Sequence, residues 1–297
     1  NSAFMHMVRD EDNKGYRRLI RETLAADPRV LERFVNFMTN PDERPVAEQF
    51  GTGDKAFAAA TLLATLPGLP MLGHGQVEGF RERYGMEFRK ARWDEPVDQS
   101  HADHFAWAIV PLLRRRAAFS GTSDFHLYDA RRDDGAVDEN VYAYSNGRGA
   151  DRSLVLVHHH YGETTVRVDW SMAAAAPGGS GGSGLTSVRL ADALALEGPD
   201  EQVVRLVDHR SGYELRSTHG DLRREGLRVS LGAYEARVLA VEGDIAPSKP
   251  PTERVEPVQA KRNRRRPVRP GAPLSSPAPL PRPRRAARRR SSAPPGG

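Results

Sequence analysis

The sequence predicts a fold of two kinds, an α/β part with parallel strands followed by an all-β part with antiparallel strands. Two apolar segments, near residues 34–38 and 66–72, each end in a polar turn, and an alanine-rich helix separates them. This order is typical of a parallel α/β barrel, whose buried strands carry polar side chains at their carboxyl ends. After Gly121 the chain changes to short β-rich runs with turn residues between them, which indicates an antiparallel sandwich.

Three segments of the first part have helical patterns. The first begins at Asp12 or Asn13 and is closed by a proline. Its apolar face repeats at helical spacing and consists of Tyr16, Leu19, Ile20, Thr23 and Leu24. The second covers residues 54–66, begins at a capping aspartate and is stopped by a Pro-Gly pair. The third covers about residues 100–119, and we expect Pro111 to kink it.

The second part is predicted to consist mainly of strands. They cover residues 125–130, 141–145, 153–158, 164–170, 203–208, 227–231 and 235–241. A glycine-serine loop at 178–184 is expected to be flexible, and a short helix over 190–196 follows it. At 297 residues the chain is long enough to bury a substantial core.

The candidate site lies where the two parallel strands end. The first strand runs into Asn40 and Asp42, and the second exits through His74, Gln76 and Glu78. In a parallel barrel these ends form the face where binding and chemistry occur. Each residue also has a structural interpretation, because Asn-Pro-Asp is ordinary turn and helix-capping chemistry and the other three side chains can serve as loop hydrogen-bonding groups.

Charge is distributed unevenly along the chain. Residues 247–297 hold 14 Lys and Arg against 2 Glu, whereas the preceding residues carry 30 basic and 37 acidic groups. This tail also holds 13 of the 22 prolines, so we expect it to be disordered. Its arginines could neutralise phosphates of a nucleic acid, but no aromatic side chain lies among them to stack on bases, which favours a solvated extension. The arginines concerned are Arg262, Arg264, Arg265, Arg266, Arg284, Arg285, Arg288, Arg289 and Arg290.

Other features argue against several classes of site. The chain has no cysteine, so a disulfide framework and a thiolate zinc site are excluded. The longest apolar run, residues 56–72, is interrupted by threonines and prolines and predicts no membrane span. The His158-His159-His160 triplet lies at a strand end, where successive side chains alternate between faces, so no metal site is expected there. Trp93 and Trp170 could stack on sugars, although core or interface packing is favoured for both.

Several segments together resemble the α-amylase superfamily. The strand and turn Phe-Val-Asn-Phe-Met-Thr-Asn-Pro-Asp and the strand Pro-Gly-Leu-Pro-Met-Leu with its Gly-Gln-Val-Glu-Gly exit look like the last two βα units of that superfamily. The resemblance continues through Tyr-Gly-Met-Glu-Phe-Arg at 84–89, Leu-Leu-Arg-Arg-Arg at 112–116, Tyr-Ala-Tyr-Ser-Asn at 142–146 and Asp-His-Arg-Ser-Gly at 208–212. It covers roughly residues 3–242.

The resemblance implies a TIM (β/α)8 barrel followed by a β-sandwich, and cleavage of α-glucan or a related oligosaccharide with retention of configuration. Asp42 matches the carboxylate that stabilises the transition state, and Asn40 matches the asparagine of the same motif. His74, Gln76 and Glu78 are then substrate-side candidates. No cofactor is implied, and no metal site, because the usual calcium ligands of the superfamily lie outside this region.

Two departures from the family pattern change what is expected. Pro41 stands where the superfamily places a sugar-binding histidine. The resemblance also starts just before the seventh barrel strand, and no Gly-x-Arg-x-Asp segment with a nucleophile precedes Phe34. We therefore expect residues 1–120 to be the carboxyl-terminal part of a barrel, 121–245 a β-sandwich domain and 246–297 the tail.

The predicted function is that of a partial α-amylase-like glycoside hydrolase. The chain alone is expected to be inactive, and its partners would be an oligosaccharide or polysaccharide and the missing amino-terminal barrel half. The alternatives are a non-catalytic carbohydrate-binding or scaffolding derivative of the fold and a nucleic-acid binder acting through the tail. No signal peptide is visible before the first helix, and the compartment stays open.

Overall fold

The computed structural model describes residues 1–83, 89–176 and 184–245. They belong to one compact unit. Three expectations lie outside the described residues: the family resemblance at 84–88, most of the glycine-serine loop, and the basic tail with its nucleic-acid alternative. Within the part that is described, no helix is both long and apolar enough to cross a membrane.

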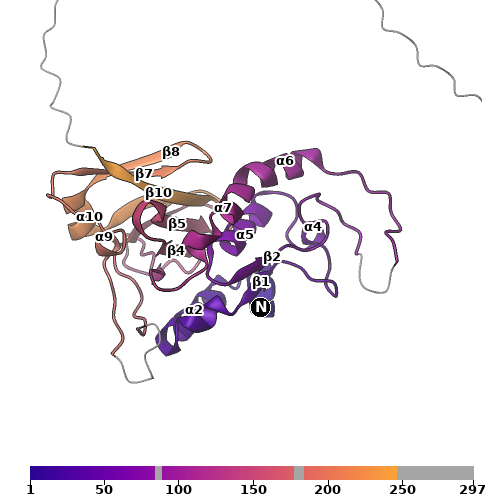
Figure 1. Cartoon of the computed structure of the whole chain (residues 1–297), viewed down its shortest axis with the longest axis horizontal. Coiled ribbons are helices and arrows are strands. Elements are labelled where there is room, and N and C mark those ends of the chain that lie inside the picture. The colour runs from indigo at the N-terminus through magenta and orange to yellow at the C-terminus, as the bar shows by residue number, and fades with distance from the viewer. Residues whose placement is uncertain (84–88, 177–183, 246–297) are drawn as a thin grey trace, which may run out of the picture. The chain divides into compact units, whose positions relative to one another are not determined.

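The first part of the chain is built from helices around a short parallel sheet (Figure 1). Its elements are α1 (Ser2–Arg9), α2 (Asn13–Ala26), α3 (Arg29–Glu32), β1 (Val35–Phe37), α4 (Val46–Gln49), α5 (Asp54–Thr65) and β2 (Leu69–Met71). Helix α2 confirms the predicted capping, because the Asp12 carboxylate accepts a hydrogen bond of 3.0 Å from the Gly15 amide. Helix α1 was not predicted. It forms because Phe4 and Val8 are fully buried, and the Phe4 ring meets Tyr16 edge-on with centroids 5.6 Å apart.

The strands β1 and β2 pair in parallel, as the sequence predicts. Val35 lies opposite Leu69, and Phe37 lies opposite Met71. The chain enters β2 through Gly68 at φ +97°, where a Cβ would lie 2.4 Å from the Phe34 carbonyl oxygen. Only glycine permits this close approach and this left-handed backbone.

The predicted kinked helix over residues 100–119 is instead three short helices. They are α6 (Gln99–Ala108), α7 (Val110–Arg114) and α8 (Arg116–Phe119). The first break falls at Ile109, two residues before Pro111, which lies in the first turn of α7 where its missing amide donor is not required. The Arg116 guanidinium then binds α8 to the end of α5 and the start of β2, donating to the carbonyl oxygens of Ala64 at 2.6 Å and Gly68 at 2.5 Å.

The second part of the chain is built mainly from antiparallel sheets. The six-stranded sheet has the order β3 (His126–Tyr128), β4 (Val141–Asn146), β5 (Ser153–His158), β10 (Ala236–Ile245), β7 (Val203–Asp208) and β8 (Tyr213–Thr218). A separate antiparallel pair joins β6 (Thr164–Val168) to β9 (Leu227–Leu231). The short helices of this part are α9 (Leu190–Ala193), α10 (His219–Glu225) and the 3-10 helix η1 (Gly149–Asp151). The predicted strands and short helix are confirmed, whereas β8 and α10 were not predicted.

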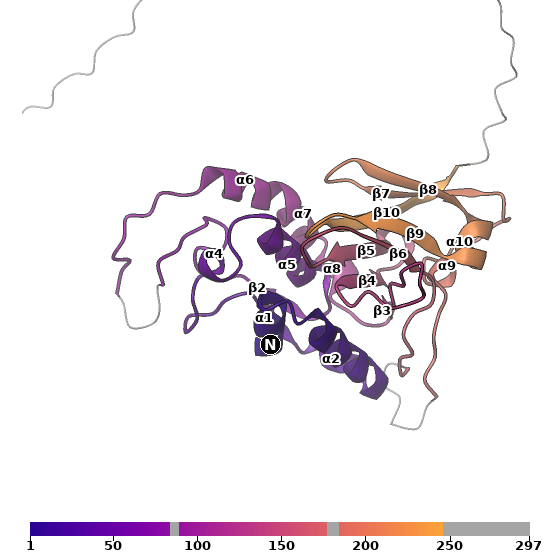
Figure 2. The ribbon, with the colours of Figure 1, turned by 180° about the vertical axis from the view of Figure 1, so that it is seen from behind.

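The six-stranded sheet separates two hydrophobic cores. Tyr142 and Tyr144 of β4 belong to the core shared with the helices of the first part, while Val141 and Ala143 belong to the core shared with β6, β9, α9 and α10. Helix α5 contacts β5 and β10 on the helical side, as Figure 2 shows. Because both faces are covered, every residue of β4 and β5 is buried. This explains the unbroken Leu-Val-Leu-Val run of β5.

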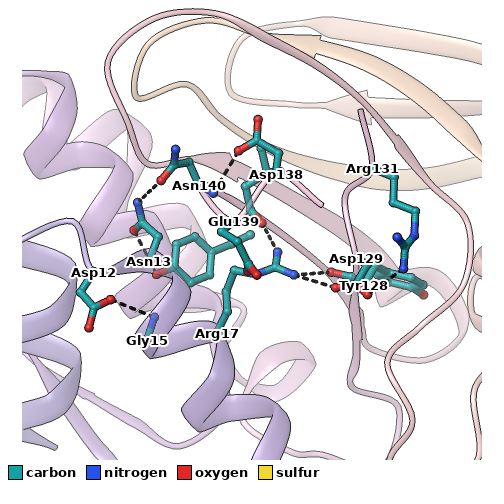
Figure 3. A network of polar contacts seen from close by, with 12 residues as sticks. Asp12, Asn13, Gly15, Arg17, Tyr128, Asp129, Arg131, Asp138, Glu139 and Asn140 are labelled. Carbon is teal, nitrogen blue, oxygen red and sulfur yellow. Dashed lines mark hydrogen bonds and ion pairs between the residues drawn. The ribbon is translucent and has the colours of Figure 1, made fainter. Parts of the chain in front are cut away.

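A buried polar network joins helix α2 to the sheet (Figure 3). The Arg17 side chain is 1% exposed and donates from Nε to Glu139 at 3.1 Å and from Nη2 to Asp129 at 3.0 Å. It also donates to the carbonyl oxygen of Val141. One turn earlier, the Asn13 amide group donates to the side chain of Asn140 at 3.0 Å. The network therefore connects residues on both sides of the predicted domain boundary between residues 120 and 121. That boundary stays a prediction.

Candidate functional site

The loops that follow β1 and β2 meet around one cavity of about 180 Å³. Thr39, Asn40 and Pro41 line it from the first strand, and Leu72, Gly73 and His74 line it from the second. Parallel strands bring their carboxyl ends to the same edge of a sheet, so the pairing of β1 with β2 produces this meeting. Of the predicted site residues, the cavity brings together Asn40 and His74.

Close packing of Thr39 against Gly73 holds the two loops together. A Cβ on Gly73 would lie 2.1 Å from the Thr39 methyl carbon, so a larger residue would push the loops apart. The Thr39 hydroxyl donates to the Arg44 carbonyl oxygen at 2.7 Å, which fixes the rotamer that points the methyl group at Gly73. The cavity therefore depends on a glycine at this strand exit.

The Asn40-Pro41-Asp42 segment is a tight turn. The Asn40 side-chain oxygen accepts a hydrogen bond of 2.9 Å from the Asp42 amide, which is the usual asparagine turn. Asp42 is exposed, and Arg83 donates to its main-chain oxygen at 2.5 Å. No residue in the described ranges bonds to the Asp42 carboxylate, and Asp42 is not among the residues that line the cavity.

The second loop is held by Gln76, whose side chain is buried. Its Oε1 accepts from the Gly73 amide at 3.1 Å, and its main-chain oxygen lies 2.9 Å from His101 Nε2. These contacts match the loop-bonding interpretation of this residue. The main-chain oxygen of Glu78 accepts from the Asp98 amide at 2.9 Å, which attaches the end of the loop to the start of α6.

His74 occupies a different position from Gln76, because its side chain is exposed at the cavity. Its ring lies 5.9 Å from that of Phe80. An imidazole at this place can exchange hydrogen bonds with the hydroxyl groups of a ligand.

Glu82 also lines the cavity and was not predicted. Its carboxylate accepts from the main-chain amides of Arg92 at 2.7 Å and Trp93 at 2.9 Å. Glu95 accepts in return from the Arg81 and Glu82 amides. The sequence gives no signal for this arrangement, because the charged segment around Glu82 has the composition of a solvated loop.

Among the described residues, the two carboxylates that line the cavity differ in their contacts. Glu82 is held by two amides, and Glu43 lies 3.8 Å from His6 Nε2. Retaining glycosidases need a free nucleophile and a second carboxyl group about 5–5.5 Å away. Asp42 is not among the residues that line the cavity, so Glu43 is the lining carboxylate without a side-chain hydrogen bond to a described residue, and no free pair of carboxylates lies there.

The other candidates raised by the sequence, apart from the exposed Trp93, have structural partners. The Nδ1 atoms of His158 and His160 lie 2.8 and 2.7 Å from main-chain oxygens, and that of His159 lies 3.1 Å from the Asn13 side chain. In the ranges that the structure describes, no group of three or more His, Asp, Glu or Cys residues is placed to hold a metal ion. The Trp170 ring is covered by the Arg189 guanidinium at 4.6 Å, and Trp93 is 57% exposed.

Several solved structures are similar to this chain. An α-amylase from Geobacillus thermoleovorans complexed with acarbose matches over 71% of this chain and 39% of its own, with 14% identity and a TM-score of 0.46. The noncanonic maltogenic α-amylase AmyB from Thermotoga neapolitana matches over 70% and 40%, with 13% identity and a TM-score of 0.42. A debranching enzyme from Nostoc punctiforme matches over 70% and 35%, with 13% identity and a TM-score of 0.43.

These structures include members of the family that the strand-end motifs resemble. The chain spans about two fifths of the length of the enzymes it matches. No protein-family profile and no curated protein sequence matches the chain.

Proposed function

We propose that this chain is the carboxyl-terminal portion of an α-amylase-like retaining glycosidase that acts on an α-glucan or a related oligosaccharide. Residues 1–120 would supply the last two βα units of the barrel, and residues 121–245 the β-sandwich that follows it. The nucleophile and the acid/base would come from barrel strands outside this chain. No cofactor enters this proposal.

The observation that carries the proposal is an open apolar face on the β1–β2 pair. Val35 and Phe37 alternate with the buried Asn36 along β1, so they lie on the other face of the strand. Leu69 and Met71 lie opposite them in the register. Val35 is 38% exposed and Leu69 60% exposed, so the two-stranded sheet leaves a pair of aligned aliphatic side chains open on one face.

A closed barrel accounts for this face. Its inward side chains fill the interior in layers with those of the other strands, and closure leaves no free edge. The same closure would bring further strand ends around the Asn40–His74 cavity, where the two missing carboxyl groups are required. The open face, the parallel pairing and the cavity at the strand ends are therefore consistent with one incomplete barrel.

In the completed site, Asp42 would accept hydrogen bonds from hydroxyl groups of the reacting sugar. These contacts would strengthen as the ring distorts towards the oxocarbenium-like transition state. Asn40 would hold the turn that presents Asp42, while His74 and Glu78 would lie on the substrate side and Gln76 would hold the loop.

The proposal is tested first on the coding sequence. We expect the reading frame to continue upstream of Asn1 and to encode a Gly-x-Arg-x-Asp segment followed by a strand-end glutamate. The protein produced from that longer frame is expected to hydrolyse α-glucan with retention of configuration, as read by NMR of the first product anomer. A stop codon directly upstream, or inversion at the anomeric carbon, would contradict it.

Pro41 favours a second candidate, a non-catalytic carbohydrate-binding derivative of the same fold. Proline fixes φ and lacks the hydrogen-bonding ring that the family pattern places there. In that case the longer protein would bind α-glucan without cleaving it. The Pro41→His variant of the longer protein separates the glycosidase from the non-catalytic binder. It is expected to raise hydrolysis only if the rest of the catalytic site is present.

A further inference from the structure

A second cavity, of about 350 Å³, lies between the helical part and the β part of the chain. Its walls come from α5 and α6 on one side and from the β7–β8 and β9–β10 connections on the other. It shares no lining residue with the Asn40–His74 cavity. Its size is within the range of small-molecule sites.

One wall of this cavity is aromatic. The Phe57 ring of α5 lies 4.1 Å from the His104 ring of α6, and His104 lies 5.2 Å from Trp107. Trp107 follows His104 by three residues, so both lie on the same side of the helix. Trp107 is nevertheless 49% exposed at the cavity, and its indole contributes a flat apolar surface that the core does not use.

The opposite wall is polar and fixed. Asp208 is 1% exposed and accepts from Arg210 Nε at 3.0 Å and from Arg210 Nη2 at 2.7 Å. Burial would raise the pKa of Asp208, but the guanidinium and two main-chain amides hold that pKa below its usual value. Arg210 also donates to the carbonyl oxygens of Ala108 and Ala236, so four of its five N–H bonds are directed to protein acceptors.

The charges on the cavity select against an anion. The Arg210 charge is matched by Asp208, and the Glu235 carboxylate accepts from Arg237 Nε and the Gly232 amide, which leaves the Asp54 carboxylate of the lining without such a partner among the described residues. Ser211 adds a hydroxyl group, and Asp54 and Ser211 are both exposed. A ligand without negative charge therefore suits the cavity, with hydroxyl donors for the Asp54 carboxylate and an apolar face for Trp107.

A pyranose meets these requirements, because its axial C–H groups form an apolar face and its hydroxyl groups lie around the edge. We propose that the Trp107 cavity is a second saccharide-binding site, separate from the strand-end cavity. The choice of an α-glucan oligosaccharide as its ligand rests on the proposed function. This site is complete within the chain, so it can bind without the missing barrel strands.

The test is a titration of the purified chain with maltotriose, in which calorimetry measures the heat of binding. We expect measurable binding that the Trp107→Ala variant weakens by about tenfold, because this variant removes the flat apolar surface on which the sugar ring packs. Trp107→Phe keeps a flat ring and is expected to lose less. Tyr161→Ala is the matched control, since Tyr161 is an aromatic residue that is 79% exposed and does not line this cavity, and the affinity of this variant should equal that of the unchanged chain.

The Asp42→Asn variant keeps the two proposals apart. Binding that is lost in Trp107→Ala and kept in Asp42→Asn supports the second site, whatever the activity of the longer protein. Unchanged binding in Trp107→Ala overturns the second site, and loss in Asp42→Asn alone assigns the sugar to the strand-end cavity instead. Absence of maltotriose binding by the unchanged chain also overturns it. Thermal unfolding of each variant checks the fold, and we expect Trp107→Ala to keep the unfolding temperature of the unchanged chain because Trp107 is exposed.

Discussion

Arg17 is the buried cation that joins the helical part to the β part. Its guanidinium contacts two carboxylates, on Asp129 and Glu139, which are themselves 30% and 39% exposed. It also donates to main-chain oxygens of β3 and β4. The fork of N–H groups on arginine suits several acceptors at once, which a lysine could not match.

Replacing Arg17 by leucine is expected to destabilise the fold by about 3 kcal/mol, at the lower end of the range for breaking a buried ion pair, because both carboxylates keep some contact with water. The measurement is urea unfolding followed by circular dichroism. Arg18→Leu on the same helix is the control, since Arg18 is 64% exposed and its removal should change stability by less than about 0.5 kcal/mol. Equal effects in the two variants would contradict the role given to Arg17.

His159 is a buried histidine that the fold keeps neutral. Its Nδ1 lies 3.1 Å from the Asn13 side-chain oxygen, so Nδ1 carries the proton, and its buried Nε2 has no hydrogen-bond partner among the described residues. Burial lowers the pKa of His159 to about 4, and the nearby Glu11 carboxylate only partly opposes this. Protonation at Nε2 would place an unpaired cation in the core.

This arrangement predicts a loss of stability in acid. The unfolded chain binds a proton at His159 near pH 6.5, whereas the folded chain does so only near pH 4, so stability falls as the pH drops through that window. The full loss is about 3 kcal/mol. Urea unfolding of His159→Asn at several pH values should show a shallower pH dependence, because asparagine keeps a donor for Asn13 but does not titrate. His160→Asn, at an exposed position, should keep the original slope; a slope unchanged in His159→Asn would refute the assignment.

At the scale of elements, the contact between the β1 and β2 exits decides whether the strand-end cavity forms. Gly73→Ala is expected to destabilise the chain by about 1–3 kcal/mol, because the added methyl group meets the Thr39 side chain. The double variant with Thr39→Ser removes the obstructing methyl group and keeps the hydroxyl bond to Arg44. We expect the destabilisation of the double variant to be about 1 kcal/mol smaller than the sum of the two single destabilisations, as measured by a double-mutant cycle. Strict additivity would show that the two loops do not touch.

Most elements could be predicted from the sequence where the pattern was local. Helix α2 has a cap and an apolar stripe, and the strands of the large sheet are rich in β-branched and aromatic residues. Helix α1 was missed because it is short and is stabilised by contacts with α2. Strand β8 was missed because its half-buried residues alternate only weakly and it pairs at the edge of the sheet.

The candidate site was predictable in outline only. The order of strand, helix and strand brings Asn40 and His74 to one edge, which the sequence could indicate. For Gln76 the sequence left a substrate-side and a loop-bonding interpretation open, because the burial that decides between them depends on the packing of Met38 and His101 around it. The second cavity could not be predicted at all, since its walls come from segments a hundred residues apart.

At the scale of the whole molecule, the open apolar face of β1 and β2 is expected to make the isolated chain self-associate. Unpaired strand edges and aligned aliphatic side chains are the usual cause of such association. Leu69→Lys should weaken it, as measured by light scattering over a range of concentrations. Leu185→Lys is the matched control, because Leu185 is 52% exposed but lies in the β part. If the chain stays monomeric at all concentrations, the open apolar face of β1 and β2 does not cause self-association, and this prediction is wrong.

The central claim is that this chain holds the sugar-binding carboxylate Asp42 but not the groups that break the glycosidic bond. The most direct measurement is hydrolysis of soluble α-glucan by the purified chain and by the protein from the longer reading frame. We expect no hydrolysis by the chain, hydrolysis by the longer protein, and a loss of about 10²–10³-fold in kcat when Asp42 is replaced by Asn in the longer protein. Hydrolysis by the chain alone, or full activity of the longer Asp42→Asn protein, would contradict the account.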